Sequence, residues 1–192
     1  MPTPNPNAVE FLKTRRSRPA KTLKAPGPSG SELDELLTIA SRSPDHGKLE
    51  PWRFVVIEQA AMQRLADGVA ARGAEMGLDA DQIDKGRQQF DQGICAVAVI
   101  EVQKPSEKIP AIEQTYAVGG VCLALLNAAL ASGWGANWLS GWPSHDAQWG
   151  QTYLGLTDQE RIAGFIHIAT ENVTPPERPR PDVAALTTRI TE

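Results

Sequence analysis

Apolar residues recur along this chain in two patterns. Segments with apolar residues three and four positions apart predict helices, and short continuous apolar runs predict strands. The expected helices are Ala8–Arg16, Ser29–Pro44, Gln59–Glu75, Tyr116–Ser132 and Asp146–Leu154. The expected strands are Phe54–Glu58, Ile94–Val102, Gly133–Leu139 and Ala163–Ala169. Because strands and helices interleave, we expect an α/β or α+β domain of three layers.

Two segments are too apolar to lie at a surface. Ile94–Val102 is almost entirely apolar and rich in β-branched residues, which is typical of a central strand covered on both faces. Tyr116–Ser132 is apolar almost all round, so we expect a helix that is buried on every side. A membrane span is the alternative, but the run falls short of roughly 20 apolar residues and contains Asn127.

The polar segments are expected to connect these elements. Asp79–Gln92 is weakly periodic and predicts a mobile excursion over the surface, and Ser140–Pro143 predicts a tight turn. Residues 1–7 predict a flexible tail, and prolines keep residues 174–192 extended. Arg178 and Arg180 in that tail are either solvated or reach an anion. The chain 1–192 is expected to form a single domain.

The composition is that of a soluble globular protein, with 41% hydrophobic and 22% charged residues in a chain of 192. The net charge of -4 argues against a nucleic-acid partner, which normally requires a basic excess. Cys95 and Cys122 have neither CxxC nor zinc-ligand spacing, so we expect buried thiols in a reducing compartment. No signal peptide is visible, and a cytoplasmic location is expected.

The loop Arg42–Trp52 is the most distinctive stretch. Pro44 and Pro51 restrict the backbone, so the connection is shaped rather than floppy, and loops of this kind carry sites. Arg42 has the planar charged fork that suits a phosphate or a carbonyl-rich ring, and His46 follows four residues later. An ordinary connection with a solvated arginine is the alternative.

Most common site motifs are absent. GxGxxG, GxxxxGK[ST] and GxSxG do not occur, which removes the motifs of the dinucleotide turn, the P-loop and the nucleophile elbow. His46, His145 and His167 lie on different elements without metal-ligand spacing, and His167 is expected to be a core residue. An anion-and-ring site remains, built from the cations of the first quarter and the aromatic-rich segment Gly133–Trp142.

These residues carry a resemblance to a known family. The Arg-Arg-Ser that ends the first helix, the loop Ser-Pro-Asp-His-Gly-Lys-Leu-Glu-Pro-Trp and the segment Gly-Trp-Gly-Ala-Asn-Trp-Leu-Ser-Gly resemble the FMN-dependent nitroreductase family. The nearest likeness is to its small YdjA-like branch of NAD(P)H nitroreductases. The resemblance runs from about Phe11 to Ala169.

The resemblance implies a fold, an assembly and a set of binding residues. The fold would be α+β, with a central, mostly antiparallel sheet flanked by helices in three layers. Two chains would form an intertwined homodimer with FMN in each of two interfacial clefts, and the apolar helix would be its core. The implied FMN-binding residues are Arg15, Arg16, Ser17, Arg42, His46, Trp138, Leu139 and Ser140. The residues implied for the nicotinamide nucleotide are Ala128, Ala129, Leu130, Ala131, Ser132 and Gly133.

The implied function is that of an NAD(P)H-dependent flavin oxidoreductase that reduces a small electron-poor acceptor, such as a nitroaromatic or a quinone, through flavin N5. Arginine forks bind the FMN phosphate, and a nearby guanidinium stabilises the charge of the reduced ring. No side chain need act as a nucleophile. Leu139 stands where the branch often carries arginine, which leaves two alternatives open: a flavin-binding protein without turnover, and a flavoenzyme with another reaction, such as a dehydrogenase or a dehalogenase.

Overall fold

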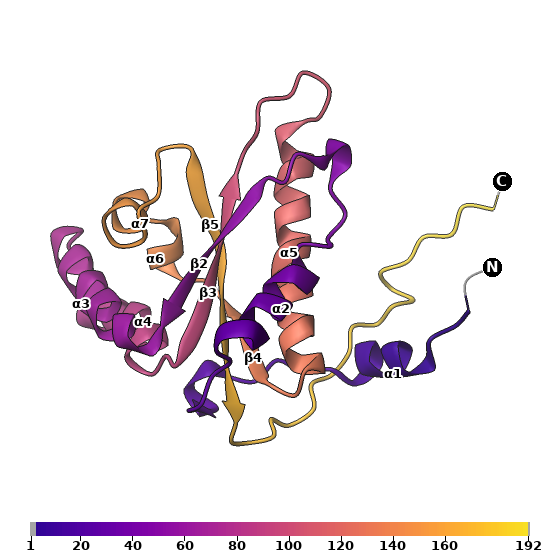
Figure 1. Ribbon diagram of the computed structural model, residues 1–192, viewed down its shortest axis with the longest axis horizontal. Coiled ribbons are helices and arrows are strands. Elements are labelled where there is room, and N and C mark those ends of the chain that lie inside the picture. The colour runs from indigo at the N-terminus through magenta and orange to yellow at the C-terminus, as the bar shows by residue number, and fades with distance from the viewer. Residues whose placement is uncertain (1–2, 192) are drawn as a thin grey trace.

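A five-stranded antiparallel sheet forms the centre of the molecule (Figure 1). The computed structural model describes residues 3–191. The strands are β1 (Leu23–Lys24), β2 (Trp52–Glu58), β3 (Cys95–Val102), β4 (Gly135–Leu139) and β5 (Glu160–Glu171). Their order is β1-β5-β3-β2, and β4 also pairs with β5. β5 therefore pairs with β1, β3 and β4, and β3 joins β2 to the sheet.

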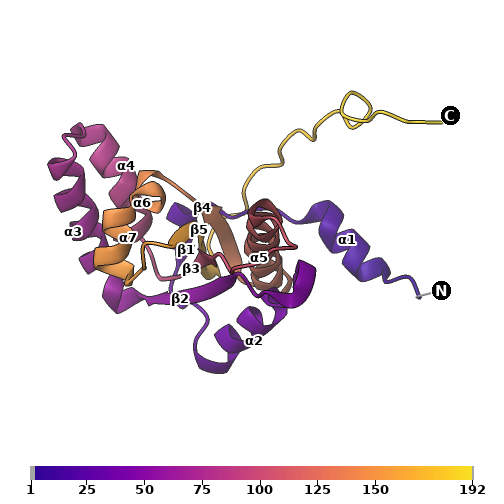
Figure 2. The same ribbon diagram turned by 90° about the horizontal axis from the view of Figure 1, so that it is seen from above.

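Helices cover both faces of the sheet (Figure 2). One face is covered by α2 (Gly30–Ala40) and α5 (Ala111–Ala131). The other is covered by α3 (Gln59–Glu75), α4 (Ala80–Asp91), α6 (Trp142–His145) and α7 (Ala147–Leu154). Along β3, Val97 and Val99 face the first layer while Ala96 and Ala98 face the second. The predicted three-layer α+β fold and the doubly covered central strand are thus confirmed.

α5 is long and apolar enough to cross a membrane by length and composition alone. It nevertheless packs along the sheet, where Val118, Val121, Cys122, Leu125 and Ala129 are buried. Its burial is one-sided within the chain. The sequence predicted a helix buried on every side, but Ile112, Tyr116 and Leu123 are 52%, 70% and 46% exposed in the single chain.

Several predicted boundaries were wrong. Asp79–Gln92 is the regular helix α4 rather than an irregular excursion, because Asp79 and Gln82 bond reciprocally across its first turn and Phe90 is fully buried. Trp142 and Pro143 open the short helix α6 instead of completing a turn. The first helix, α1, spans Pro6–Thr14, because Asn5 caps it and Pro6 suits its first position.

The two ends of the chain project from the body (Figures 1 and 2). α1 buries no residue, and within residues 174–191 the structure has neither helix nor strand. The extended C-terminal segment agrees with the prediction from its prolines. The two-residue strand β1 and the short 3-10 helices Ala20–Thr22 and His46–Lys48 were not predicted.

Candidate functional site

The Arg15–Ser17 segment lies just past the end of α1 and is fastened to the sheet. The backbone N–H of Arg18 donates to the carbonyl of Ala136 in β4 at 2.8 Å, and Arg18 Nε lies 2.8 Å from a carboxylate oxygen of Glu171 in β5. Arg15 donates to Ser17 Oγ at 3.2 Å. The sheet edge therefore holds the three predicted residues in one place.

These residues line a cavity of about 540 Å³ together with Pro19, Asn137, Trp138 and the C-terminal residues Pro175, Pro176, Arg178, Pro179, Arg180 and Pro181. Four of the lining residues are arginines, and no lining residue is acidic. Burial, together with nearby Arg180, Arg16 and Arg18, lowers the pKa of Arg15 below its ordinary value. Its Nε is buried without a hydrogen-bond partner. The cavity is therefore suited to an anion.

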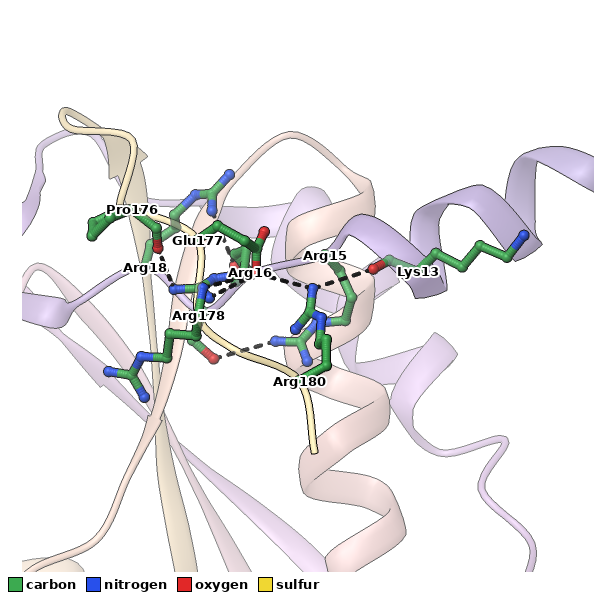
Figure 3. A network of polar contacts seen from close by, with 9 residues as sticks. Lys13, Arg15, Arg16, Arg18, Pro176, Glu177, Arg178 and Arg180 are labelled. Carbon is green, nitrogen blue, oxygen red and sulfur yellow. Dashed lines mark hydrogen bonds and ion pairs between the residues drawn. The ribbon is translucent and has the colours of Figure 1, made fainter. Parts of the chain in front are cut away.

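The C-terminal segment lies directly on this arginine group (Figure 3). Arg16 donates to the carbonyl of Pro176 at 2.7 Å and to Glu177 Oε1 at 3.2 Å. Arg180 lies 3.2 Å from the same carboxylate oxygen and donates to the carbonyl of Lys13 at 3.3 Å. Arg178 and Arg180 thus line the predicted site while remaining exposed, and their contact with an anion stays a prediction.

A second cavity, of about 280 Å³, adjoins the first, and the two share Pro19 and Asn137. Leu139, Ser140 and Gly141 line it at the end of β4. Besides Ala20, its other walls are polar side chains that the sequence did not single out: Lys21, Lys85, Gln88, Gln89 and Gln92. The last four belong to α4 or directly follow it, so the missed helix supplies one wall of the predicted site.

Trp138 is placed by an unusually close contact with the neighbouring strand. Any side chain at Gly164 of β5 would collide with the indole of Trp138. The glycine thus allows the indole to approach β5 closely, where it remains 37% exposed and lines the first cavity.

Arg42 and His46 lie elsewhere in the chain. His46 Nδ1 is 2.6 Å from a carboxylate oxygen of Glu113, which lies in the first turn of α5. The Arg15–Ser17 segment is tied instead to β4, which follows the other end of α5 (Figure 1). A helix of 21 residues is roughly 30 Å long, so one chain does not bring His46 to the Arg15–Ser17 segment. Arg42 lies nearer the middle of α5, because the adjacent Ser43 lies beside Gly120.

The loop that carries His46 is conformationally specific. Gly47, Lys48 and Glu50 have φ values of +76°, +54° and +49°, a region that lysine and glutamate seldom occupy. The N–H of Glu50 donates to Asp45 Oδ2 at 2.7 Å and holds the turn. The structure therefore agrees with the prediction of a shaped connection, and such strain is more common at functional sites than elsewhere.

The segment implied for the nicotinamide nucleotide is divided between the core and the surface. Ala128 and Ala129 are buried among the core residues, whereas Ala131, Ser132 and Gly133 are exposed at the end of α5. None of the six residues lines either of the two cavities. Only the exposed part of this segment is placed to meet a ligand from solvent.

The remaining titratable groups of note are core residues. Cys95 and Cys122 are buried, and burial raises their pKa values to about 11 and about 12. His167 is 2% exposed, and burial lowers its pKa to about 4. The predictions that these side chains lie in the core are confirmed. Within residues 3–191 no group of three or more histidine, cysteine, aspartate or glutamate side chains could hold a metal ion.

Comparison with known proteins gives consistent results. Residues 12–170 match the model of the nitroreductase family. The "Putative NAD(P)H nitroreductase YdjA" of Escherichia coli K12 is 31% identical over 164 residues, which are 85% of this chain and 88% of that protein. A "Putative NAD(P)H nitroreductase" of Haemophilus influenzae is 30% identical over 166 residues, with the same coverage.

Solved structures share the fold at lower identity. A nitroreductase-like family protein from Bacillus cereus has a TM-score of 0.80 at 22% identity, with 99% of each chain covered. A "putative nitroreductase in complex with fmn" from Desulfovibrio desulfuricans has a TM-score of 0.73 at 19% identity, covering 99% of this chain and all of that one. The family model spans most of the chain, and both relatives are at least 30% identical to it. This protein therefore belongs to the nitroreductase family.

Proposed function

We propose that this protein binds FMN and uses NAD(P)H to reduce small electron-poor acceptors such as nitroaromatics or quinones. The observation that carries the proposal is the arginine-lined cavity at Arg15–Ser17, which adjoins a second cavity at Ser140 lined in part by lysine and glutamine side chains. An arginine-lined end followed by a hydrogen-bonding end matches a cofactor with a phosphate at one end and a polar ring at the other. The orphaned Nε of Arg15 adds an unused donor at the phosphate end.

The protein would hold the cofactor through three sets of groups. Arg15, Arg16 and Ser17 would bind the phosphate, Trp138 would pack beside the chain that joins phosphate and ring, and a backbone N–H at Ser140 or Gly141 would orient the ring. Lys21 and Lys85 add positive charge at the second cavity. When bound, FMN supplies a ring that can take a hydride from a nicotinamide and pass it to an acceptor.

We propose further that two chains complete each site. His46 lies at the opposite end of α5 from Arg15, and Ser43, next to Arg42, lies beside Gly120 in the middle of α5. A two-fold related copy would bring Arg42 and His46 to the partner's cavity. The exposed apolar side chains Ile112, Tyr116 and Leu123 on α5 supply a surface for that contact. An isologous dimer would thereby join the two sets of residues that a single chain keeps apart.

The test begins with purified full-length protein. It should be yellow or become yellow with added FMN, and the colour should bleach under anaerobic conditions with NADH or NADPH. A nitroaromatic or quinone should then restore it. Protein that gains no visible absorbance with FMN would overturn the proposal, and colour that persists with both nucleotides would favour a flavin-binding protein without turnover, in line with Leu139 at the ring end.

A further inference from the structure

The C-terminal segment 175–181 closes the phosphate end of the proposed FMN site. The carboxylate of Glu177, within this segment, pairs with two arginines there. Glu177 Oε1 lies 3.2 Å from Arg16 Nη1 and 3.2 Å from Arg180 Nη2, so one oxygen bridges two guanidinium groups (Figure 3). Arg16 Nη2 is engaged as well, by the carbonyl of Pro176 at 2.7 Å. Both terminal nitrogens of Arg16 thus face the segment.

The positive charge of the cavity explains why an acidic side chain lies beside it. The cavity is lined by Arg15, Arg16, Arg178 and Arg180 without an acidic lining residue, and such a group repels itself unless an anion is near. Glu177 is mostly exposed, whereas the side chain of Arg16 is only 13% exposed. The carboxylate can therefore leave toward solvent, while the guanidinium stays with the sheet edge.

We propose that Glu177 is a built-in competitor for the anion site: it occupies Arg16 in the cofactor-free chain, and the incoming phosphate group takes its place. A phosphate monoester carries nearly two negative charges and binds an arginine fork through two oxygens, so it outcompetes a single carboxylate that bonds one nitrogen. The exchange releases Arg180 from Glu177 together with Arg16. The inference rests on the proposed FMN site and concerns how that site is occupied before the cofactor arrives.

The experiment compares full-length wild type with Glu177→Gln, which keeps the shape of the side chain and removes its charge. Glu35→Gln is the matched control, because Glu35 is exposed on α2, lines neither cavity and loses the same charge. Dissociation constants are measured on cofactor-free protein for FMN and for riboflavin, which lacks the phosphate. Inorganic phosphate is titrated as a competitor of FMN.

Because a partly exposed ion pair contributes modestly, we expect Glu177→Gln to tighten FMN binding by roughly two- to tenfold. Riboflavin should bind wild type and variant equally, inorganic phosphate should compete at lower concentration in the variant, and Glu35→Gln should match wild type. An FMN dissociation constant that is unchanged or higher in Glu177→Gln would overturn the exchange. Equal tightening for riboflavin, or for Glu35→Gln, would overturn it as well.

The two proposals fail in different ways. A wild-type protein that binds neither FMN nor inorganic phosphate would remove the proposed function and this inference with it. A wild-type protein that binds FMN, with a Glu177→Gln variant that binds no more tightly, would remove the inference alone.

Discussion

At the scale of single residues, the surroundings of each arginine decide what it does. Arg53 and Arg72 each bond a carboxylate through two nitrogens, on Glu160 and Asp146 respectively, and connect elements of the fold. The side chain of Arg16 bonds only Pro176 and Glu177, which belong to a segment without secondary structure, and it lines a cavity. Arg53 and Arg72 therefore stabilise the fold, whereas Arg16 is available to bind a ligand.

Arg16→Ala is therefore expected to act on cofactor binding more than on folding. Loss of a charge-assisted hydrogen bond to phosphate should cost about 1.5 to 3 kcal/mol, or roughly ten- to a hundredfold in FMN affinity. Arg64→Ala is the control, since Arg64 bonds the carbonyl of Tyr153 at 3.3 Å and lines neither cavity. Flavin titrations and thermal melts of the cofactor-free proteins measure both effects. Equal FMN affinity in the two variants would show that the phosphate site is wrongly placed.

Glu160 predicts a pH dependence of folding stability. The hydrogen bonds from Arg53 lower the pKa of Glu160 from 4.5 to about 2 in the folded protein. A folded pKa below the unfolded value stabilises the protein above about pH 4.5, and this stabilisation is lost as the pH falls toward 2. Because Arg53 is 36% exposed, solvent screening reduces the contribution to on the order of 1 to 2 kcal/mol.

Urea unfolding of wild type and Glu160→Gln at several pH values tests this dependence. The variant should be less stable at pH 6, and the difference in free energy of unfolding should shrink steadily toward pH 3. A difference that stays constant with pH would mean that the Glu160 carboxylate is not held in the ionised form by Arg53.

At the scale of elements, the long apolar segments were predictable and the polar ones were not. Ile94–Val102 and Gln59–Glu75 have enough apolar side chains for their periodicity to reveal β3 and α3. α4 has only Phe90 and Gly86 fully buried, so its pattern is weak although Asp79 and Gln82 carry the capping signal. β1 has two residues, which is too short for any alternation to be visible.

The same difference limits what could be predicted of the candidate site. The family resemblance indicated Arg15–Ser17 and Leu139–Ser140, which the structure brings to adjoining cavities. Lys85 and Gln89 were missed because α4 was interpreted as surface excursion. The contact between Arg16 and Glu177 joins residues 161 positions apart, and no local pattern predicts such a pairing.

α4 should be sensitive to a single methyl group where it meets α6. An added Cβ at Gly86 would lie 2.5 Å from Trp142 Nε1 and 2.9 Å from a methyl group of Val69. Gly86→Ala should therefore destabilise the protein by about 1 to 3 kcal/mol, although alanine normally stabilises a helix interior by roughly 0.5 to 1 kcal/mol. The measurement is the free energy of unfolding in urea.

A double-mutant cycle identifies the cause of that loss. In a Trp142→Leu background the ring that collides with the new Cβ is absent, so the cost of Gly86→Ala should fall by at least about half. An equal cost in both backgrounds would place the strain elsewhere in α4.

At the scale of the whole molecule, the long helix α5 separates two groups of predicted binding residues. Its C-terminal end leads to β4 and the arginine cavity, and its N-terminal end contacts His46 through Glu113. Between these two ends, α5 exposes apolar side chains to solvent. Monomeric proteins seldom expose several apolar side chains together on one helix. A second copy seated on that surface would cover the apolar side chains and complete both sites at once.

Leu123→Lys tests this assembly without disturbing the chain itself. Leu123 is 46% exposed, so lysine at that position is solvated in a single chain and should change its stability by no more than about 0.5 kcal/mol. In a dimer the ammonium group would be buried against apolar side chains at a cost of several kcal/mol. Met76→Lys is the matched control, because Met76 is 43% exposed and lies at the end of α3, away from α5.

Light scattering should give twice the 20.7 kDa chain mass for wild type and for Met76→Lys. Leu123→Lys should have a lower mass and should bind FMN more weakly. If Leu123→Lys keeps both the doubled mass and the FMN affinity, another surface forms the dimer, and Arg42 must serve a role other than binding the partner's cofactor.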